Sequence, residues 1–202
     1  MSTSGSGAET GLSDPLTADA CSRRLVILVN DLPAAGKTTL ARALSRRLSL
    51  PLFSKDVIKE AHADIIGAQP PDGRPQRAWN SQFGAAANAT IWARLADSPG
   101  GAVLESTWPS QETWGLVKSG LNAAEVPAPR QIWCEVPLDL ARERFAARQP
   151  ARHPIHGEPP DEEEWSGRWA LARPLPIPDT LHVNNTGPVD LDAITDWCRC
   201  PR

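Results

Sequence analysis

The sequence predicts an α/β fold in which a parallel five-stranded sheet carries helices on both faces and a loop-rich lid covers one edge. Two observations lead to this fold. Short apolar segments alternate with longer segments of helical periodicity along the chain, as in proteins built around a parallel sheet. No internal repeat or second domain interrupts the alternation, so the 202 residues fit one domain with a substantial core.

The expected elements follow one another without long gaps. Residues 1–22 are rich in Ser, Thr, Gly and Ala and are predicted to form a disordered leader before a domain at residues 23–202. The five strands are expected at residues 25–29, 52–53, 102–105, 132–136 and 181–183. Helices are expected after the first strand, up to Gly67, across 79–95, from Pro109, at 138–149 and at 189–197. One short helix is also expected around Trp165 and Trp169, within an otherwise loop-rich segment.

Bulk properties narrow the classes of partner. The formal net charge of −3 and the pI near 5.8 give no basic field, so a nucleic acid partner is not indicated. No apolar run has the length of a membrane span or the place of a signal peptide. The four cysteines lack the spacing of a zinc site or a disulfide scaffold, which favours the cytoplasm. Oligomeric state leaves no signal in the sequence.

The strongest local signal lies where the first strand ends. The strand leads through a tight loop into a helix that opens with Gly36-Lys37-Thr38-Thr39. Backbone N–H groups of such a loop and the positive end of the helix can bind phosphates. Lys37, expected to face solvent, would supply a mobile cation for the terminal phosphates, and Thr38 a hydroxyl for Mg²⁺. The alternative is an ordinary strand-turn-helix with a chance Gly-Lys-Thr.

The phosphate-loop pattern has one departure in this chain. Asp31 stands five residues before Gly36, where the pattern G-x-x-x-x-G-K-[ST] has its first glycine. Asp tolerates left-handed backbone angles better than most residues, so the turn remains feasible. Its carboxylate would weaken nucleotide binding if it faced the phosphates. This position therefore leaves the affinity for ATP open.

Four segments together resemble the small P-loop kinases. They are the loop Leu32–Leu40, Ser54–Lys59, the strand end Val103–Thr107 and Arg144–Arg148. The chain looks closest to the AAA-type ATPase domains of the zeta-toxin, chloramphenicol phosphotransferase and polynucleotide-kinase-like kind. The resemblance implies the P-loop nucleoside triphosphate hydrolase fold and transfer of the γ-phosphate of ATP to a hydroxyl, with Mg²⁺.

The resemblance also assigns roles to individual residues. It implies ATP binding by the loop residues Leu32, Pro33, Ala34, Ala35, Gly36, Lys37, Thr38 and Thr39. Asp56, just after the second strand, matches the acid that accepts the proton of the acceptor hydroxyl in several such kinases. Arg144 and Arg148 resemble lid arginines that close over the phosphates, in a lid expected at about residues 144–178. Asn185 and Thr186 lie where relatives contact the adenine.

Each chemical role has a structural alternative. Asp56 is also well placed to be a helix N-cap. Glu105 ends a buried strand, where an acid needs either a metal site or a basic neighbour such as Lys55 or an arginine. The two arginines share a helix face, which solvated surface charge would also explain. His153 and His156 lack further ligands at metal spacing and are interpreted as lid residues.

Three functions remain open on the sequence. The first is an ATP-dependent kinase of a small hydroxylated molecule. The second is a kinase of nucleic acid 5′-hydroxyls, which the absence of a basic surplus disfavours. The third is a nucleotide-binding regulatory module with little turnover, for which Asp31 is the supporting feature.

Overall fold

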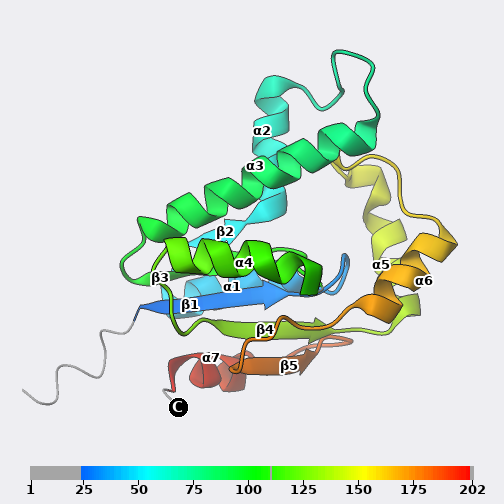
Figure 1. The fold of residues 1–202 in the computed structure, drawn as a ribbon. Helices are drawn as coiled ribbons and strands as arrows, with labels where there is room; N and C mark the ends of the chain where they lie inside the picture. Colours follow the sequence, from blue (N-terminus) through cyan, green and yellow to red (C-terminus); the bar gives the residue numbers. More distant parts are fainter. Residues whose placement is uncertain (1–23, 110, 201–202) are drawn as a thin grey trace, which may run out of the picture.

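The computed structural model describes residues 24–109 and 111–200, so the predicted leader lies outside the described residues. Its sheet is parallel throughout and has the strand order β2-β3-β1-β4-β5 (Figure 1). The strands are β1 (Leu25–Asn30), β2 (Leu52–Ser54), β3 (Gly101–Glu105), β4 (Arg130–Glu135) and β5 (Thr180–Asn184). The predicted α/β fold and all five predicted strands are confirmed.

Helices follow the strands as the alternation predicted. They are α1 (Lys37–Leu48), α2 (Lys55–Ile66), α3 (Gln76–Ala96), α4 (Gln111–Ala123), α5 (Leu138–Arg148), α6 (Glu162–Leu171) and α7 (Leu191–Arg199), with short 3₁₀ turns η3 (Gln149–Ala151) and η4 (Pro154–His156). The last helix begins two residues later than predicted because the side chain of Asp190 accepts a hydrogen bond from the Ala193 N–H. No helix in the described ranges combines the length and the hydropathy of a membrane span.

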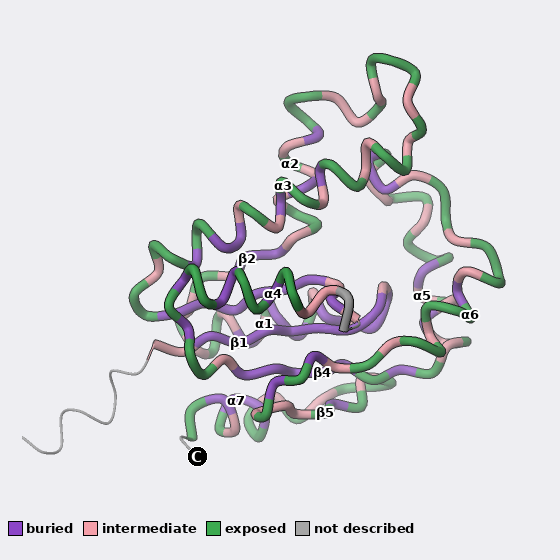
Figure 2. Tube along the Cα trace, in the orientation of Figure 1, coloured by how far each residue is buried: buried purple, intermediate pink, exposed green. Residues whose placement is uncertain are grey.

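The sheet is buried on both faces, which explains its continuous apolar strands. Alternate residues of β1 point to opposite sides: Ile27 and Val29 pack with α1 and α7, whereas Val26 and Leu28 pack with α3 and α4. In Figure 2 the central strands are accordingly coloured as buried along most of their length. This packing fixes the carboxyl ends of β1, β2 and β3 along one edge of the sheet.

The segment predicted as a loop-rich lid is held at two points. Its η4 turn inserts the fully buried Ile155 between Ala63 of α2 and Phe83 of α3. Its α6 helix places Trp165 edge-on against Phe145 of α5, with ring centroids 5.0 Å apart. Figure 1 shows the chain between α5 and α6 passing beside the N-terminal end of α3. The lid therefore contains more regular structure and more buried apolar surface than its prolines indicate.

Candidate active site

The loop between β1 and α1 has the backbone of an anion-binding turn. Asp31, Ala34 and Gly36 have φ angles of 151°, 67° and 84°, all positive. A side chain at position 36 would also meet Asn185, because an added Cβ would lie 2.3 Å from its Nδ2 atom. Position 36 therefore requires glycine for both conformation and space. The alternation of backbone angles turns N–H groups toward the start of α1, where phosphates bind favourably.

The sequence analysis expected Lys37 to face solvent, and this prediction is wrong. Its side chain is buried, and its Nζ atom donates a hydrogen bond of 2.7 Å to the carbonyl oxygen of Leu32. The ammonium group thus lies inside the curve of the loop rather than in open solvent. It is already at the place where the loop would hold phosphates, so it needs little rearrangement to meet an anion.

Asp31 adopts the glycine-like backbone that the pattern requires, but its carboxyl is buried. Burial and the charge of Glu135 raise the pKa of Asp31 to about 7, against the opposing effects of the Leu32 N–H and Lys37. Asp31 does not line the cavities described below. Asp31 in place of the pattern's first glycine therefore acts on the buried base of the loop and does not face the phosphates.

Two oxygen groups suited to Mg²⁺ lie side by side. The Thr38 hydroxyl donates to a Glu105 carboxylate oxygen at 3.2 Å, and the Ser54 hydroxyl donates to the other oxygen. Glu105 is buried and has no ion pair within residues 24–109 and 111–200, so the predicted alternative of a basic partner is wrong. Carboxylate and hydroxyl oxygens at the head of α1 fit Mg²⁺, which takes the remaining ligands from phosphates and water.

These groups face a cleft of about 640 Å³ at the carboxyl edge of the sheet. The residues that line it include Lys37, Thr38, Asp56, Glu105 and Arg148. The predicted phosphate, metal and base residues are thus brought to one space, as expected for the carboxyl ends of parallel strands.

Asp56 is the second residue of α2, so the alternative of a helix N-cap is wrong. The cap position is Ser54, and Asp56 makes no capping hydrogen bond there. Partial withdrawal from water opposes its ionisation, but the positive charges around it, first that of Lys55 and then those of His156, Lys37 and Lys59, outweigh that effect and keep the pKa of Asp56 below its ordinary value. The carboxylate is therefore charged at neutral pH and free to accept a proton or a hydroxyl hydrogen bond.

A buried polar network behind Asp56 was missed by the sequence analysis. The Lys59 ammonium donates to Asn80 Oδ1 and to His156 Nδ1, the latter at 3.2 Å. The Nε2 atom of His156 lies 2.7 Å from Glu60 Oε1. Because an ammonium only donates, Nδ1 accepts and Nε2 carries the proton. The spacing of Lys59 and Glu60 one helical turn after Asp56 was the available signal.

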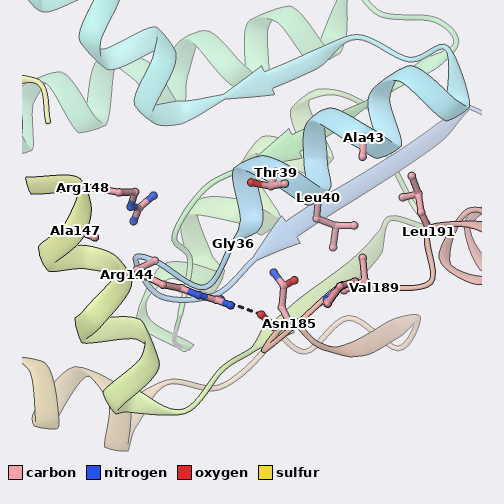
Figure 3. A pocket seen from close by; sticks show the side chains of 13 residues that line it. Gly36, Thr39, Leu40, Ala43, Arg144, Ala147, Arg148, Asn185, Val189 and Leu191 are labelled. Carbon is pink, nitrogen blue, oxygen red and sulfur yellow. Dashed lines mark hydrogen bonds between the residues drawn. The ribbon is translucent and has the colours of Figure 1, made fainter. Parts of the chain in front are cut away.

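Arg144 and the loop after β5 line a second cavity of about 600 Å³ next to the phosphate loop (Figure 3). Arg144 donates to the carbonyls of Asn185 and Thr186 at 2.9 and 3.0 Å. Asn185 in turn donates to the Ala35 carbonyl at 2.6 Å. Arg144 is thus held at the loop after β5, while Arg148 lines both this cavity and the cleft. The walls add apolar side chains, namely Leu40, Val189 and Leu191.

A comparison with protein families shows to which family the chain belongs. A family model described as an AAA domain matches residues 26–166. The chain belongs to the AAA domain family. The matched part of this AAA domain runs from β1 into α6 and so contains the phosphate loop, Asp56 and Glu105. It ends before Asn185 and Thr186, the predicted adenine contacts.

Solved structures extend the likeness over most of the AAA domain. A presumed kinase from Chloroflexus aurantiacus is 29% identical with a TM-score of 0.73, covering 88% of this chain and 98% of that chain. A gluconokinase from Sinorhizobium meliloti is 16% identical with a TM-score of 0.55, covering 87% and 89%. Shikimate kinase from Acinetobacter baumannii, in complex with shikimate, is 13% identical with a TM-score of 0.54, covering 88% and 92%.

These likenesses confirm the predicted small P-loop kinase group and the predicted fold. At 13% and 16% identity, the last two show the fold alone. No curated protein matches the chain.

Proposed function

We propose that this AAA domain protein is an ATP-dependent phosphotransferase that moves the γ-phosphate of ATP to a hydroxyl of a small molecule, with Mg²⁺. The supporting observation is that one cleft is lined by Lys37, by the Thr38–Glu105 pair and by Asp56. A cation, a pair of hard oxygen ligands and an ionised carboxylate are the three groups that phosphoryl transfer needs beside the phosphate loop.

In this proposal the loop and Lys37 bind the β- and γ-phosphates. Thr38 and Glu105 hold Mg²⁺, which neutralises phosphate charge when bound. Transfer breaks the bond between the γ-phosphorus and the ADP oxygen and forms one to the acceptor oxygen. The acceptor proton passes to the Asp56 carboxylate. Because the transition state is loose, Asp56 has mainly to orient the hydroxyl and receive its proton late.

The nucleoside would occupy the cavity between α5 and the loop after β5. Its apolar wall at Leu40, Val189 and Leu191 offers contact to a base, and Arg144 braces the loop carbonyls. Arg148 borders both cavities and is placed to meet the phosphates between them. Contact of Asn185 and Thr186 with adenine stays part of the proposal.

A small acceptor is favoured over a nucleic acid. Among the structural neighbours, some are named for a small hydroxylated acceptor, including the gluconokinase and the shikimate kinase. The net charge of −3 gives no field to attract a polyanion. The cytoplasmic setting stays part of the proposal.

The test is single-turnover transfer from Mg-ATP to a panel of hydroxylated metabolites and 5′-hydroxyl oligonucleotides. A phosphorylated small molecule supports the proposal, and transfer to the oligonucleotides supports the polynucleotide kinase instead. Tight ATP binding without any product supports the regulatory module. Lys37→Met is the matched negative control, since it keeps the length of the side chain but removes the cation, and transfer should fall by at least about 10³.

A further inference from the structure

A further cavity of about 760 Å³ adjoins the cleft on the side away from the nucleoside. Four residues border both spaces, namely Pro33, Phe145, Arg152 and His156. Its outer wall comes from the start of α3 and from the lid between η4 and α6. An acceptor with its hydroxyl at Asp56 would extend its remaining atoms into this cavity, which we call the acceptor cavity.

Three guanidinium groups border the acceptor cavity, and two of them share one carboxylate. Arg168 pairs with Glu164 at 2.5 Å, and Arg77 lies 3.7 Å from the same side chain. Arg152 is different. Its guanidinium carbon lies 4.6 Å from the centroid of the Phe145 ring, and within residues 24–109 and 111–200 the guanidinium makes no hydrogen bond or ion pair with a side chain.

The carboxylates nearest to Arg152 already have other tasks. Glu60 accepts the hydrogen bond of His156, and Asp56 faces the cleft. Half-burial lowers the pKa of Arg152, against the attraction of Asp56, but the group keeps its charge at neutral pH. A partly desolvated guanidinium with unused donors binds a planar or tetrahedral anion in a bidentate fashion.

Resting on the proposed function, we propose that the phosphate acceptor carries its own anionic group, a carboxylate or a phosphate, and that Arg152 binds this group at the entrance of the acceptor cavity. The hydroxyl to be phosphorylated would then lie between this anion and Asp56. Arg152 acts here as a residue that determines specificity and takes no part in the transfer itself.

Position separates Arg152 from the arginine placed for ATP. Arg148 borders the nucleoside cavity and the cleft, whereas Arg152 borders the cleft and the acceptor cavity. The two residues are four apart in sequence and both line the cleft, but each borders a different second cavity. Loss of Arg152 should therefore weaken acceptor binding and leave ATP binding nearly unchanged.

The experiment measures binding of matched polyol sets to the full chain saturated with Mg²⁺ and a non-hydrolysable ATP analogue. Each set holds a neutral member, its carboxylate and its phosphate, such as glucose, gluconate and glucose 6-phosphate, or glycerol, glycerate and glycerol 3-phosphate. We expect one anionic class to bind at least about tenfold more tightly than its neutral partner. Arg152→Gln should remove most of that preference, about 10- to 100-fold, as expected for charge-assisted hydrogen bonds.

Two further variants complete the design. Arg152→Lys should recover part of the affinity, because it restores the charge without the planar fork. Arg46→Gln makes the same charge change on the exposed side of α1 and should change nothing. The carboxylate and phosphate arms distinguish which anion the acceptor carries.

Several results would overturn the inference. They are a panel without an anionic binder, neutral members that bind as tightly as anionic ones, and anionic binding that survives Arg152→Gln. A tenfold loss of ATP affinity in Arg152→Gln would also do so, by assigning the residue to the nucleotide. If a neutral polyol is bound and phosphorylated, the kinase proposal stands and the anion-site proposal is wrong. If anions bind through Arg152 but no transfer occurs, the anion-site proposal stands and the kinase proposal is wrong.

Discussion

The nucleotide side and the acceptor side of the cleft are built by different means. On the nucleotide side, nine consecutive residues from Asp31 to Thr39 supply a loop of positive φ angles, a helix start and one lysine. On the acceptor side, ionisable side chains gather from separate segments, with Asp56 and Lys59 on α2 and Arg152 and His156 in the lid. The nucleotide side relies on backbone geometry, and the acceptor side on side chains that only the tertiary fold brings together.

This difference separates what each substitution should change. A variant on the acceptor side should lose transfer or acceptor binding with ATP affinity intact. A variant on the nucleotide side should lose ATP or Mg²⁺ affinity with acceptor recognition intact. Three substitutions test the separation, at Asp56, Glu105 and Arg144. A fourth, at Asp31, tests the buried support of the phosphate loop, which does not border the cleft.

Asp56→Asn should give the largest effect, confined to transfer. The change keeps the size of the side chain but removes the group that accepts the acceptor proton. We expect phosphoryl transfer to fall by about 10² to 10⁴. Single-turnover kinetics measure this loss, while calorimetric ATP binding and the melting temperature serve as controls and should stay near the wild-type values. Transfer at the wild-type rate would contradict the assignment and make Glu105 the better candidate for the base.

Asp31→Asn should change stability in a pH-dependent way. The folded pKa of Asp31 is about 7, above its ordinary value of 3.8. Between these pH values the unfolded chain releases a proton that the folded protein keeps, so the wild type loses stability as pH rises from about 4 to 7. The difference should reach on the order of 4 kcal/mol above pH 7, in favour of Asp31→Asn.

Urea unfolding at pH 4, 6 and 8 measures this stability difference. Asp97→Asn, an exposed change of the same kind, should show no such pH dependence. A parallel fall in stability for the wild type and Asp31→Asn would mean that Asp31 ionises normally. ATP affinity should change little, because the carboxyl does not border the cleft.

Glu105→Gln should raise the Mg²⁺ concentration needed for transfer by about 10- to 100-fold. Glutamine can still bond with Thr38 and Ser54 but lacks the negative charge that attracts the ion. Titration of activity with Mg²⁺ at saturating ATP gives the shift, and metal-free ATP binding should be preserved. Glu143→Gln on the exposed face of α5 is the charge-matched control. An unchanged Mg²⁺ requirement would leave Glu105 with a structural role through its two hydroxyl partners.

The two sides also differ in how much the sequence could predict. Apolar strands followed by turn residues predicted the parallel sheet, and the loop around Gly36 was specific because its chemistry is contiguous in sequence. Only the spacing of Lys59 after Asp56 is visible in the sequence. Asn80 and His156 carry no local pattern, and they reach Lys59 only through the packing of α2, α3 and η4. The burial of Lys37 was missed for a different reason: its partner is the backbone carbonyl of Leu32 in the same loop, which no side-chain pattern marks.

The lid was predicted only in part. The short helix expected around Trp165 and Trp169 is present as α6, but the η4 turn that carries Ile155 lies in a stretch whose prolines and charges indicated a loop. Single apolar residues within a polar stretch have no periodicity, so sequence patterns do not detect such contacts.

Arg144→Gln should give the smallest effect and the sharpest contrast with Arg152. Arg144 braces the loop after β5 through two carbonyls, and that loop also holds Asn185 against the phosphate loop. Loss of these charge-assisted hydrogen bonds would make the wall of the nucleoside cavity less rigid. ATP would then have to order this wall when it binds, which costs part of the binding free energy. We expect ATP affinity to fall about tenfold, which corresponds to roughly 1.4 kcal/mol.

Calorimetry with a non-hydrolysable ATP analogue measures this loss. Arg142→Gln, two residues earlier on α5 and bonded to Glu162 instead, is the matched control and should keep full affinity. Anion binding in the acceptor cavity should be equal in the two variants, since neither residue borders it. If Arg144→Gln instead weakened anion binding and left ATP binding unchanged, the two sides would not be separable. The assignment of Arg144 to the nucleotide and of Arg152 to the acceptor would then be wrong.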